Sequence, residues 1–147
     1  PAYVQAHGQP ARLDDLAAHA CLVVRENGGD TGQGQRFDQW WLSRQSEGGR
    51  PGKRTPVTVS GPLSSNSGEL VRDWCLAGHG IMLRSLWDVA QALASGALVR
   101  VLPEWAMHDA DVHWIAPYRA PLPLRLRLLQ DFLAQRFASA PWNPLRP

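Results

Sequence analysis

Two short polar stretches of this sequence carry residue types that could bind a small ligand. Residues 64–67 read Ser-Ser-Asn-Ser, between the β-branched run 57–59 and a helical pattern, and residues 25–27 read Arg-Glu-Asn after the apolar run 21–24. In parallel α/β units, ligands bind beyond the carboxyl ends of the strands, where a following helix offers unpaired N–H groups. The candidate ligand-binding residues are therefore Ser65, Asn66, Ser67, Arg25, Glu26 and Asn27. For residues 25–27, the alternative is an ordinary loop.

The elements around the Ser-Ser-Asn-Ser group must position it. Residues 57–59 predict a buried strand that breaks at Gly61, and the run 80–83 predicts a second buried strand. Between them, an apolar face at helical spacing predicts a short helix. With Asn66 as its N-cap, Glu69 falls at N3, the spacing of a capping box. A strand, a helix and a strand joined by short turns predict a right-handed parallel crossover with the polar group at its ligand end.

The rest of the chain reads as alternating short helices and strands. The patterns predict helices at 3–7, 13–19, from Ser85 and over 124–137, and strands at 21–24, 39–42, 97–102 and 111–118. Residues 46–54 predict a surface turn, Trp40 and Trp41 should lie on opposite faces of their strand, and Asp88 should help to cap the helix that Ser85 begins. The last helix has an apolar stripe that should be buried, made of Leu126, Leu129, Phe132, Leu133 and Phe137.

Catalytic and metal-binding patterns are weak. No Ser-His-Asp or Cys-His arrangement can be argued from spacing, and neither a G-x-S-x-G elbow nor a phosphate-binding glycine motif is present. Asp14 and Asp15 suit the first turn of a helix better than acid–base catalysis. Residues 108–113 contain two His and two Asp without an established ligand spacing, so a solvated turn explains them better than a metal site. We therefore predict no enzyme, no metal and no cofactor.

Composition describes one globular domain. The 147 residues are 44% hydrophobic and 19% charged, with a net charge of +2. The basic residues are spread along the chain, so we expect no specific DNA binding by this chain. Cys21 and Cys75 lie in apolar patterns, which favours reduced core thiols over a disulfide. No apolar run reaches membrane-spanning length, and the start at Pro1 without a Met suggests a fragment.

The order of several motifs resembles the effector-binding domain of LysR-type transcriptional regulators. The motifs are Val59-Ser60-Gly61, Asn66-Ser67-Gly68-Glu69, Gly78-His79-Gly80-Ile81 and Gly96-Ala97-Leu98-Val99-Arg100-Val101-Leu102-Pro103. None is specific alone, but their order and spacing together are quite specific, and the resemblance covers residues 1 to 138. Where many relatives have Pro after Gly-Ile-x-Leu, this chain has Arg84, which puts a charge near the cleft or on the surface.

The resemblance implies an α/β, periplasmic-binding-protein-like (type 2) effector domain of a bacterial regulator, incomplete in this chain. Residues 1–103 would form the distal subdomain, and residues 104–147 would return to the proximal subdomain and end in a loose tail from about 138. The implied partner is a small-molecule effector between two lobes, for which an anion would suit the free N–H groups. DNA would be bound only by a winged helix-turn-helix that this chain lacks, in a cytoplasmic protein with no membrane contact. The alternative is a solute-binding protein or an enzyme of the same two-lobed fold.

The predicted last helix also suggests self-association. It resembles an element that packs on a proximal sheet, most of which is absent from this chain, so its apolar stripe would lack cover. A second copy could cover it as an isologous dimer, or by exchange of the C-terminal strand and helix across a hinge at 103–111. The alternatives are that the helix folds back onto the distal lobe or that the segment stays disordered.

Overall fold

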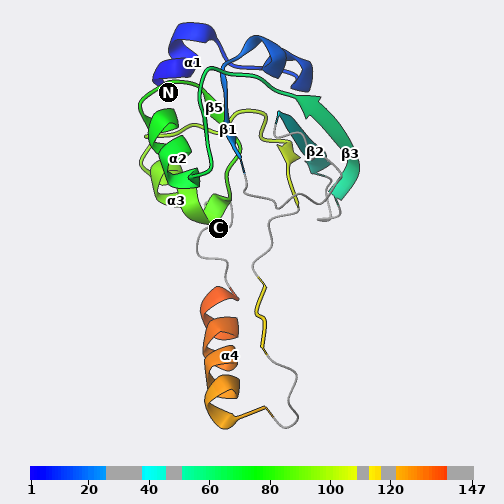
Figure 1. The fold of residues 1–147 in the computed structure, drawn as a ribbon, viewed down its shortest axis with the longest axis vertical. Coiled ribbons are helices and arrows are strands. Elements are labelled where there is room, and N and C mark those ends of the chain that lie inside the picture. Colours follow the sequence, from blue (N-terminus) through cyan, green and yellow to red (C-terminus); the bar gives the residue numbers. More distant parts are fainter. Residues whose placement is uncertain (26–37, 46–50, 109–112, 117–121, 139–147) are drawn as a thin grey trace.

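In the part of the chain that the structure describes, two three-stranded sheets form the body, and a long helix, α4, lies at one end, away from both (Figure 1). The computed structural model describes residues 1–25, 38–45, 51–108, 113–116 and 122–138. In these residues the helices are α1 (Ala2–His7), the 3-10 helix η1 (Leu13–Ala18), α2 (Gly68–Leu76), α3 (Leu86–Ala94) and α4 (Leu124–Phe137). The predicted helices are therefore confirmed.

The first sheet is parallel and places β1 at its centre. Its strands are β4 (Ser64–Ser65), β1 (Cys21–Val24) and β5 (Ile81–Met82), in the order β4-β1-β5. β1 pairs with β4 through Val24 and Ser65 and with β5 through Cys21 and Ile81. Helix α2 packs against all three strands and buries Val71 completely. The prediction of a buried strand at 21–24 is confirmed. This strand, β1, pairs with both other strands of the sheet.

The second sheet is antiparallel, with β2 (Gln39–Gln45) between β3 (Pro51–Thr58) and β6 (Trp105–Ala106). As predicted, Trp40 and Trp41 lie on opposite faces: Trp40 is buried, whereas Trp41 is exposed with the guanidinium of Arg54 over its ring. The predicted surface turn at 46–54 is wrong for residues 51–54, which belong to β3. Residues 46–50 lie outside the described residues.

The predicted crossover is present, but its first strand is not the predicted one. Val57 lies in β3 and pairs antiparallel with Trp40, so it belongs to the other sheet. The strand that precedes α2 is β4, inside the predicted polar turn, and β1 lies between β4 and β5. The chain changes sheets beside β1, where Cys21 N donates to the carbonyl of Ser60 (2.8 Å). Gly61 permits this approach because a Cβ there would overlap the backbone of Cys21.

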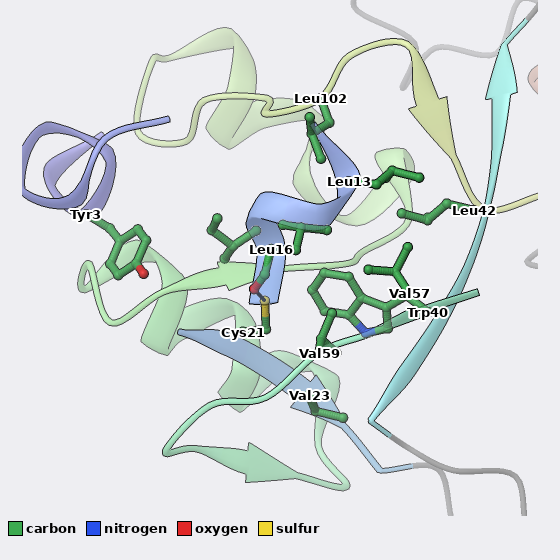
Figure 2. Packing of buried hydrophobic residues seen from close by; sticks show 11 residues of the cluster. Tyr3, Leu13, Leu16, Cys21, Val23, Trp40, Leu42, Val57, Val59 and Leu102 are labelled. Atoms are coloured by element: carbon green, nitrogen blue, oxygen red, sulfur yellow. Dashed lines mark hydrogen bonds between the residues drawn. The ribbon is translucent and has the colours of Figure 1, made fainter. Parts of the chain in front are cut away.

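One hydrophobic core joins the two sheets. Figure 2 shows its side chains converging from β1, β2, β3, α1 and η1. Leu16 of η1 and Val59, at the crossing between the sheets, are 2% and 1% exposed, so both are almost completely enclosed where the sheets meet. Tyr3 closes one end, and its hydroxyl accepts a hydrogen bond from Ala20 N (2.8 Å) just before β1. The core thus holds β1 in a fixed position under α2.

Two predicted strands are absent from the described residues. Residues 97–102 form no strand, since Leu98 N donates back to the carbonyl of Ala92 at the end of α3 (3.0 Å). Leu102 then has a positive φ of 48°, and the chain turns into β6. Of the predicted strand at 111–118, only residues 113–116 are described, and they are not in a strand.

Helix α4 has the predicted bounds but not the predicted burial. No residue of α4 is buried. Three members of the predicted stripe, Leu129, Phe132 and Phe137, are 43%, 61% and 45% exposed, and Leu126 and Leu133 are half-buried. The alternative in which α4 folds back onto the body is therefore not what the structure adopts (Figure 1).

Candidate functional site

The carboxyl ends of the three parallel strands meet at one edge of the first sheet. β4 is followed by Asn66 and Ser67, β1 by Arg25, and β5 by Leu83 and Arg84. Arg25 N donates to the carbonyl of Ser65 (2.7 Å), so the first two strand ends are in direct contact. The two predicted polar stretches are thus neighbours, as far as they are described. Glu26 and Asn27 lie outside the described residues.

The turn between β4 and α2 is organised by its own serines. Ser65 Oγ accepts from Ser67 N (3.1 Å), and Ser67 Oγ accepts from Leu70 N (3.3 Å). Ser67 is therefore the N-cap of α2, and the predicted capping box of Asn66 with Glu69 is wrong. The cap moves by one residue because Ser67 Oγ reaches the N3 amide, the donor that an N-cap side chain usually takes. Asn66 is exposed, and within the described residues its amide side chain has no hydrogen-bond partner.

The first turn of α2 keeps unpaired donors at this edge. The first N–H groups of an α-helix have no acceptor within the helix. Ser67 satisfies the N–H of Leu70 with its side chain, whereas the N–H groups of Gly68 and Glu69 have no acceptor in the part of the chain that the structure describes. The positive end of the helix dipole adds to these donors. Such a terminus can accept a negatively charged group of a ligand.

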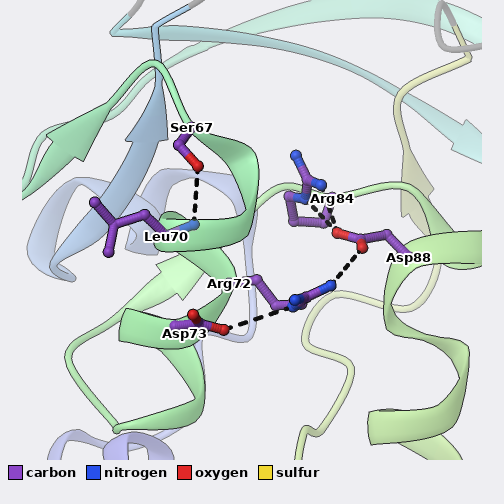
Figure 3. A network of polar contacts seen from close by, with 6 residues as sticks. All are labelled: Ser67, Leu70, Arg72, Asp73, Arg84 and Asp88. Carbon is purple, nitrogen blue, oxygen red and sulfur yellow. Dashed lines mark hydrogen bonds and ion pairs between the residues drawn. The ribbon is translucent and has the colours of Figure 1, made fainter.

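Arg84 brings a guanidinium to the same edge. A Cβ on Gly68 would overlap this guanidinium, so Arg84 lies directly against the start of α2. Figure 3 shows how Arg84 is held there: it donates to the carboxylate of Asp88 through Nε (2.9 Å) and Nη2. Arg72 of α2 donates to the other oxygen of Asp88 (2.7 Å), and its Nε lies 3.8 Å from Asp73. Asp88 thereby links α2 and α3.

Asp88 does not act as the sequence predicts. Ser85 is the N-cap of α3 and Asp88 lies in its first turn, as expected, but the Ser85 side chain makes no capping hydrogen bond. The carboxylate of Asp88 is instead shared by Arg72 and Arg84, whose charged donors bind it more strongly than the backbone N–H of Ser85 would. The sequence marks Arg84 only as a departure from the family pattern. Its place directly after the third strand end is the signal that could have added it to the candidate site.

The two cysteines are thiols of the interior. Cys21 Sγ donates to the carbonyl of Leu16 (3.6 Å), and Cys75 Sγ donates to that of Gly80 (3.3 Å). Burial raises the pKa of Cys21 to about 11, and it raises the pKa of Cys75 as well. Both thiols are therefore protonated near neutral pH and are poor nucleophiles. Both cysteines are free thiols; the predicted core position is confirmed for Cys21, which is buried, whereas Cys75 is only half-buried.

The described residues offer no other chemistry of the kinds considered in the sequence. Among them, no three His, Cys, Asp or Glu residues come together as metal ligands would. Asp109 and Asp111 of the His-Asp stretch lie outside the described residues. No helix among the described residues has both the length and the hydropathy to cross a membrane.

Comparisons with known proteins agree with this architecture. The chain is 42% identical over 138 residues to the HTH-type transcriptional regulator DmlR of Escherichia coli K12, which covers 94% of this chain and 41% of DmlR. It is 46% identical over 136 residues to the HTH-type transcriptional activator TtdR of the same strain, covering 91% of this chain and 39% of TtdR. The chain thus spans about two fifths of the length of these curated relatives.

Solved structures give the same result. The regulatory domain of AphB from Vibrio vulnificus superposes with a TM-score of 0.64 at 25% identity, over 92% of this chain and 61% of that one. CrgA, a LysR-type transcriptional regulator from Neisseria meningitidis, gives 0.59 at 27% identity, over 92% of this chain and 42% of CrgA. The type 2 periplasmic-binding-protein-like fold predicted from the resemblance is thereby confirmed. The family model "LysR substrate binding domain" matches residues 1–138, and the chain belongs to that family.

Proposed function

We propose that this chain is the effector-sensing part of a bacterial LysR-type transcriptional regulator, which binds a small-molecule inducer between two α/β lobes and so controls the DNA-bound protein. Residues 1–103 would form the distal subdomain, and residues 104–147 would return to the proximal one. The observation that carries the proposal is the meeting of three strand ends at the start of α2, where Arg25 N contacts the Ser65 carbonyl at 2.7 Å. Ligands of open α/β sheets bind at such edges.

The other functions of the whole protein would lie outside this chain. DNA would be bound by a winged helix-turn-helix, as the names of the HTH-type relatives suggest, and the regulator would act in the cytoplasm without catalysis. The alternative, a solute-binding protein or an enzyme of the same two-lobed fold, is less favoured because the relatives are transcriptional regulators. The upstream part of the intact gene product separates the two: a helix-turn-helix supports the regulator, and a secretion signal supports the alternative.

The effector's polar groups would meet Ser65, Asn66 and Ser67, with Arg25, Glu26 and Asn27 adjacent. The free amide of Asn66 and the N–H groups of Gly68 and Glu69 suit a negatively charged group. Because Ser67 is the N-cap, capping and binding can be tested separately in this turn.

The test is Asn66→Ala in the protein encoded by the intact gene, compared with Ser67→Ala, which removes the N-cap together with a proposed effector contact. The inducer is first identified by mass spectrometry of small molecules that co-purify with the protein. Asn66→Ala should raise the inducer concentration for half-maximal promoter response by roughly tenfold, since a hydrogen bond to a charged group is lost. Its melting temperature should not change, because Asn66 makes no bond within the described fold.

Ser67→Ala should weaken the response too. Unlike Asn66→Ala, it should also lower the free energy of unfolding by about 0.5–2 kcal/mol, the usual cost of removing an N-cap side chain. Thermal melts measured beside the dose–response curves distinguish the two effects. An unchanged dose–response of Asn66→Ala at normal expression would contradict its role in effector binding.

A further inference from the structure

Arg84 is anchored through one edge of its guanidinium and has N–H donors without an acceptor on the other, within the described residues. Nε and Nη2 donate to Asp88 Oδ2, and the side chain is only 20% exposed. A guanidinium has five N–H donors, so three remain: two on Nη1 and one on Nη2. None of the three has an acceptor in the part of the chain that the structure describes. Nη1 is the atom that a Cβ on Gly68 would meet first, so the open edge faces the turn where β4 passes into α2.

Two guanidinium groups share one nearly buried carboxylate here, whereas the acidic side chains of Asp73 and Glu69 are exposed. Arg72 and Arg84 share the carboxylate of Asp88, whose side chain is 9% exposed. Asp73 adds a negative charge on the far side of Arg72, but it is 64% exposed and 3.8 Å away, where solvent weakens the pair. Arg25, at the neighbouring strand end, is exposed, and the described residues give it no carboxylate partner.

We propose that Arg84 is the residue that selects a carboxylate group in the effector, and that Asp88 and Arg72 are positioning residues that hold its guanidinium at the strand edge. This inference rests on the proposed function. A carboxylate beside Gly68 receives N–H donors from Nη1 of Arg84 without any break in the Arg84–Asp88 contact. The planar fork of arginine matches a carboxylate in a way that a lysine does not.

The anchoring explains why a flexible side chain can serve as a selective contact. A free arginine loses much rotamer freedom when it orders on a ligand. Asp88 removes that freedom before the ligand arrives, and Arg72 fixes Asp88 through its second oxygen (2.7 Å). Ligand binding then costs less ordering, which is the general advantage of a preorganised site.

The experiment compares small carboxylic acids with their uncharged amides on the protein encoded by the intact gene. Acetate, benzoate, succinate and citrate are each paired with the corresponding amide, and binding is measured by thermal shift and titration calorimetry. The wild-type protein should bind at least one acid and should bind its amide about tenfold to one-hundredfold more weakly, as expected when a hydrogen bond to a charged group is lost. If no acid of the panel binds, or if an amide binds as well as its acid, the proposal is overturned.

Arg84→Gln and Arg72→Gln form a matched pair, because both remove a guanidinium from the same carboxylate. Arg84→Gln should abolish the preference for acid over amide. Arg72→Gln should only weaken it, because Asp88 still binds Arg84 after losing its second partner. If the cluster is only structural, the two variants lower the melting temperature alike and leave the preference intact, which overturns the proposal. Arg84→Lys should recover only part of the preference, since lysine lacks the fork.

Gly68→Ala removes Arg84 from its place without changing its charge. The new Cβ overlaps the tip of the guanidinium, which can move aside, so the fold should survive. The acid preference should then fall as in Arg84→Gln, and an unchanged preference would contradict the proposal. A promoter response to an uncharged co-purifying inducer would overturn the inference while the proposed function stands. A promoter that responds to no small molecule, together with no bound acid, would count against both.

Discussion

The body of the molecule and helix α4 follow the same sequence rules and reach opposite outcomes. Helix α2 of the body has an apolar face, and Val71 on that face is completely buried against the parallel sheet. Helix α4 has a less pronounced apolar stripe, with Leu128 off it, and none of its residues is buried: Leu128 and Phe132 are 59% and 61% exposed. Spacing therefore determines whether a segment is helical, whereas burial depends on the surface that the rest of the fold provides.

This difference has an energetic consequence. A fully buried Leu or Phe contributes about 1.5–3 kcal/mol relative to an exposed one. An isolated helix of 14 residues is marginal in water, because nucleation is costly and propagation gains little per residue. Helix α2 receives the packing contribution from the sheet, and α4 lacks it in the single chain. The predictions below test this contrast, from the largest expected effect to the smallest.

Replacing a leucine by alanine should change the free energy of unfolding much more in the body than in α4. Leu16 is 2% exposed in the core between the sheets, so Leu16→Ala should lower the free energy of unfolding by about 2–5 kcal/mol. Leu128→Ala is the matched change in α4, and there the effect should stay within about 0.5 kcal/mol. Urea denaturation of both variants measures the difference. Equal losses would mean that α4 is packed as tightly as the core.

A second copy of the chain should cover α4. The exposed Leu129 and Phe132 lie on its stripe, and contiguous apolar surface of this kind usually finds a partner. Light scattering after size exclusion at micromolar concentration should show a dimer. Glutamate at both positions should weaken dimerisation at least tenfold, since each apolar side chain contributes about 1.5–3 kcal/mol when buried. The exposed residue Gln130 provides the control, because Gln130→Glu adds charge on the same helix. A monomeric wild-type chain would contradict the prediction.

Where the chain passes from one sheet to the other, substitution of Gly61 should destabilise the fold, whereas substitution of Ser60 should have little effect on stability. At Gly61 a Cβ would overlap the backbone of Cys21, which cannot move without disturbing the centre of the parallel sheet. Gly61→Ala should therefore cost about 1–3 kcal/mol, the usual cost of overpacking. The neighbouring Ser60 is exposed and contributes its carbonyl rather than its side chain to β1, so Ser60→Ala should be nearly neutral. A harmless Gly61→Ala would show that the strands are not this close.

The fold was predictable from the sequence where patterns are long enough. β1 and α4 were found because an apolar run or a helical spacing extends over several turns or residues. β4 and β6 have two residues each, too few to show any pattern, so the crossover was assigned to Val57 in the other sheet. Residues 97–102 have a strand-like composition, but Leu98 N donates a hydrogen bond back to α3, and no strand forms there.

The candidate site was predictable to the same extent. The rule that strand ends carry ligands found Arg25 and the turn at Ser65, which the structure brings into contact. It did not find Arg84, because the place of this side chain depends on three features distant in sequence: the bare Cα of Gly68, the carboxylate of Asp88 and the guanidinium of Arg72. The N-cap was misplaced by one residue, since Asn66 and Ser67 are both good caps and only the backbone geometry separates them.

The smallest expected effect concerns the start of η1, where the body is stabilised by a charge rather than by burial. Asp15 Oδ2 accepts hydrogen bonds from Ala11 N (2.9 Å) and Arg12 N (2.8 Å). These backbone N–H groups, the Arg12 bond first, hold the pKa of Asp15 below its usual range. A carboxyl group whose pKa is lowered by folding stabilises the fold above its unfolded pKa, and this stabilisation is lost as the pH falls. Asp15→Asn should therefore lower the melting temperature slightly at neutral pH.

The same substitution should reduce the decline in stability between about pH 5 and the acid limit, because the titrating group is gone. Asp14→Asn is the matched control in the same turn: Asp14 is 88% exposed and lies 3.7 Å from Arg12, a solvent-exposed pair of little consequence. Melting curves recorded from neutral to acidic pH compare the three proteins. A contrary result would be that Asp15→Asn loses as much stability in acid as the wild type, whereas Asp14→Asn loses less. The N-terminal turn would then be stabilised by Asp14 and not by Asp15.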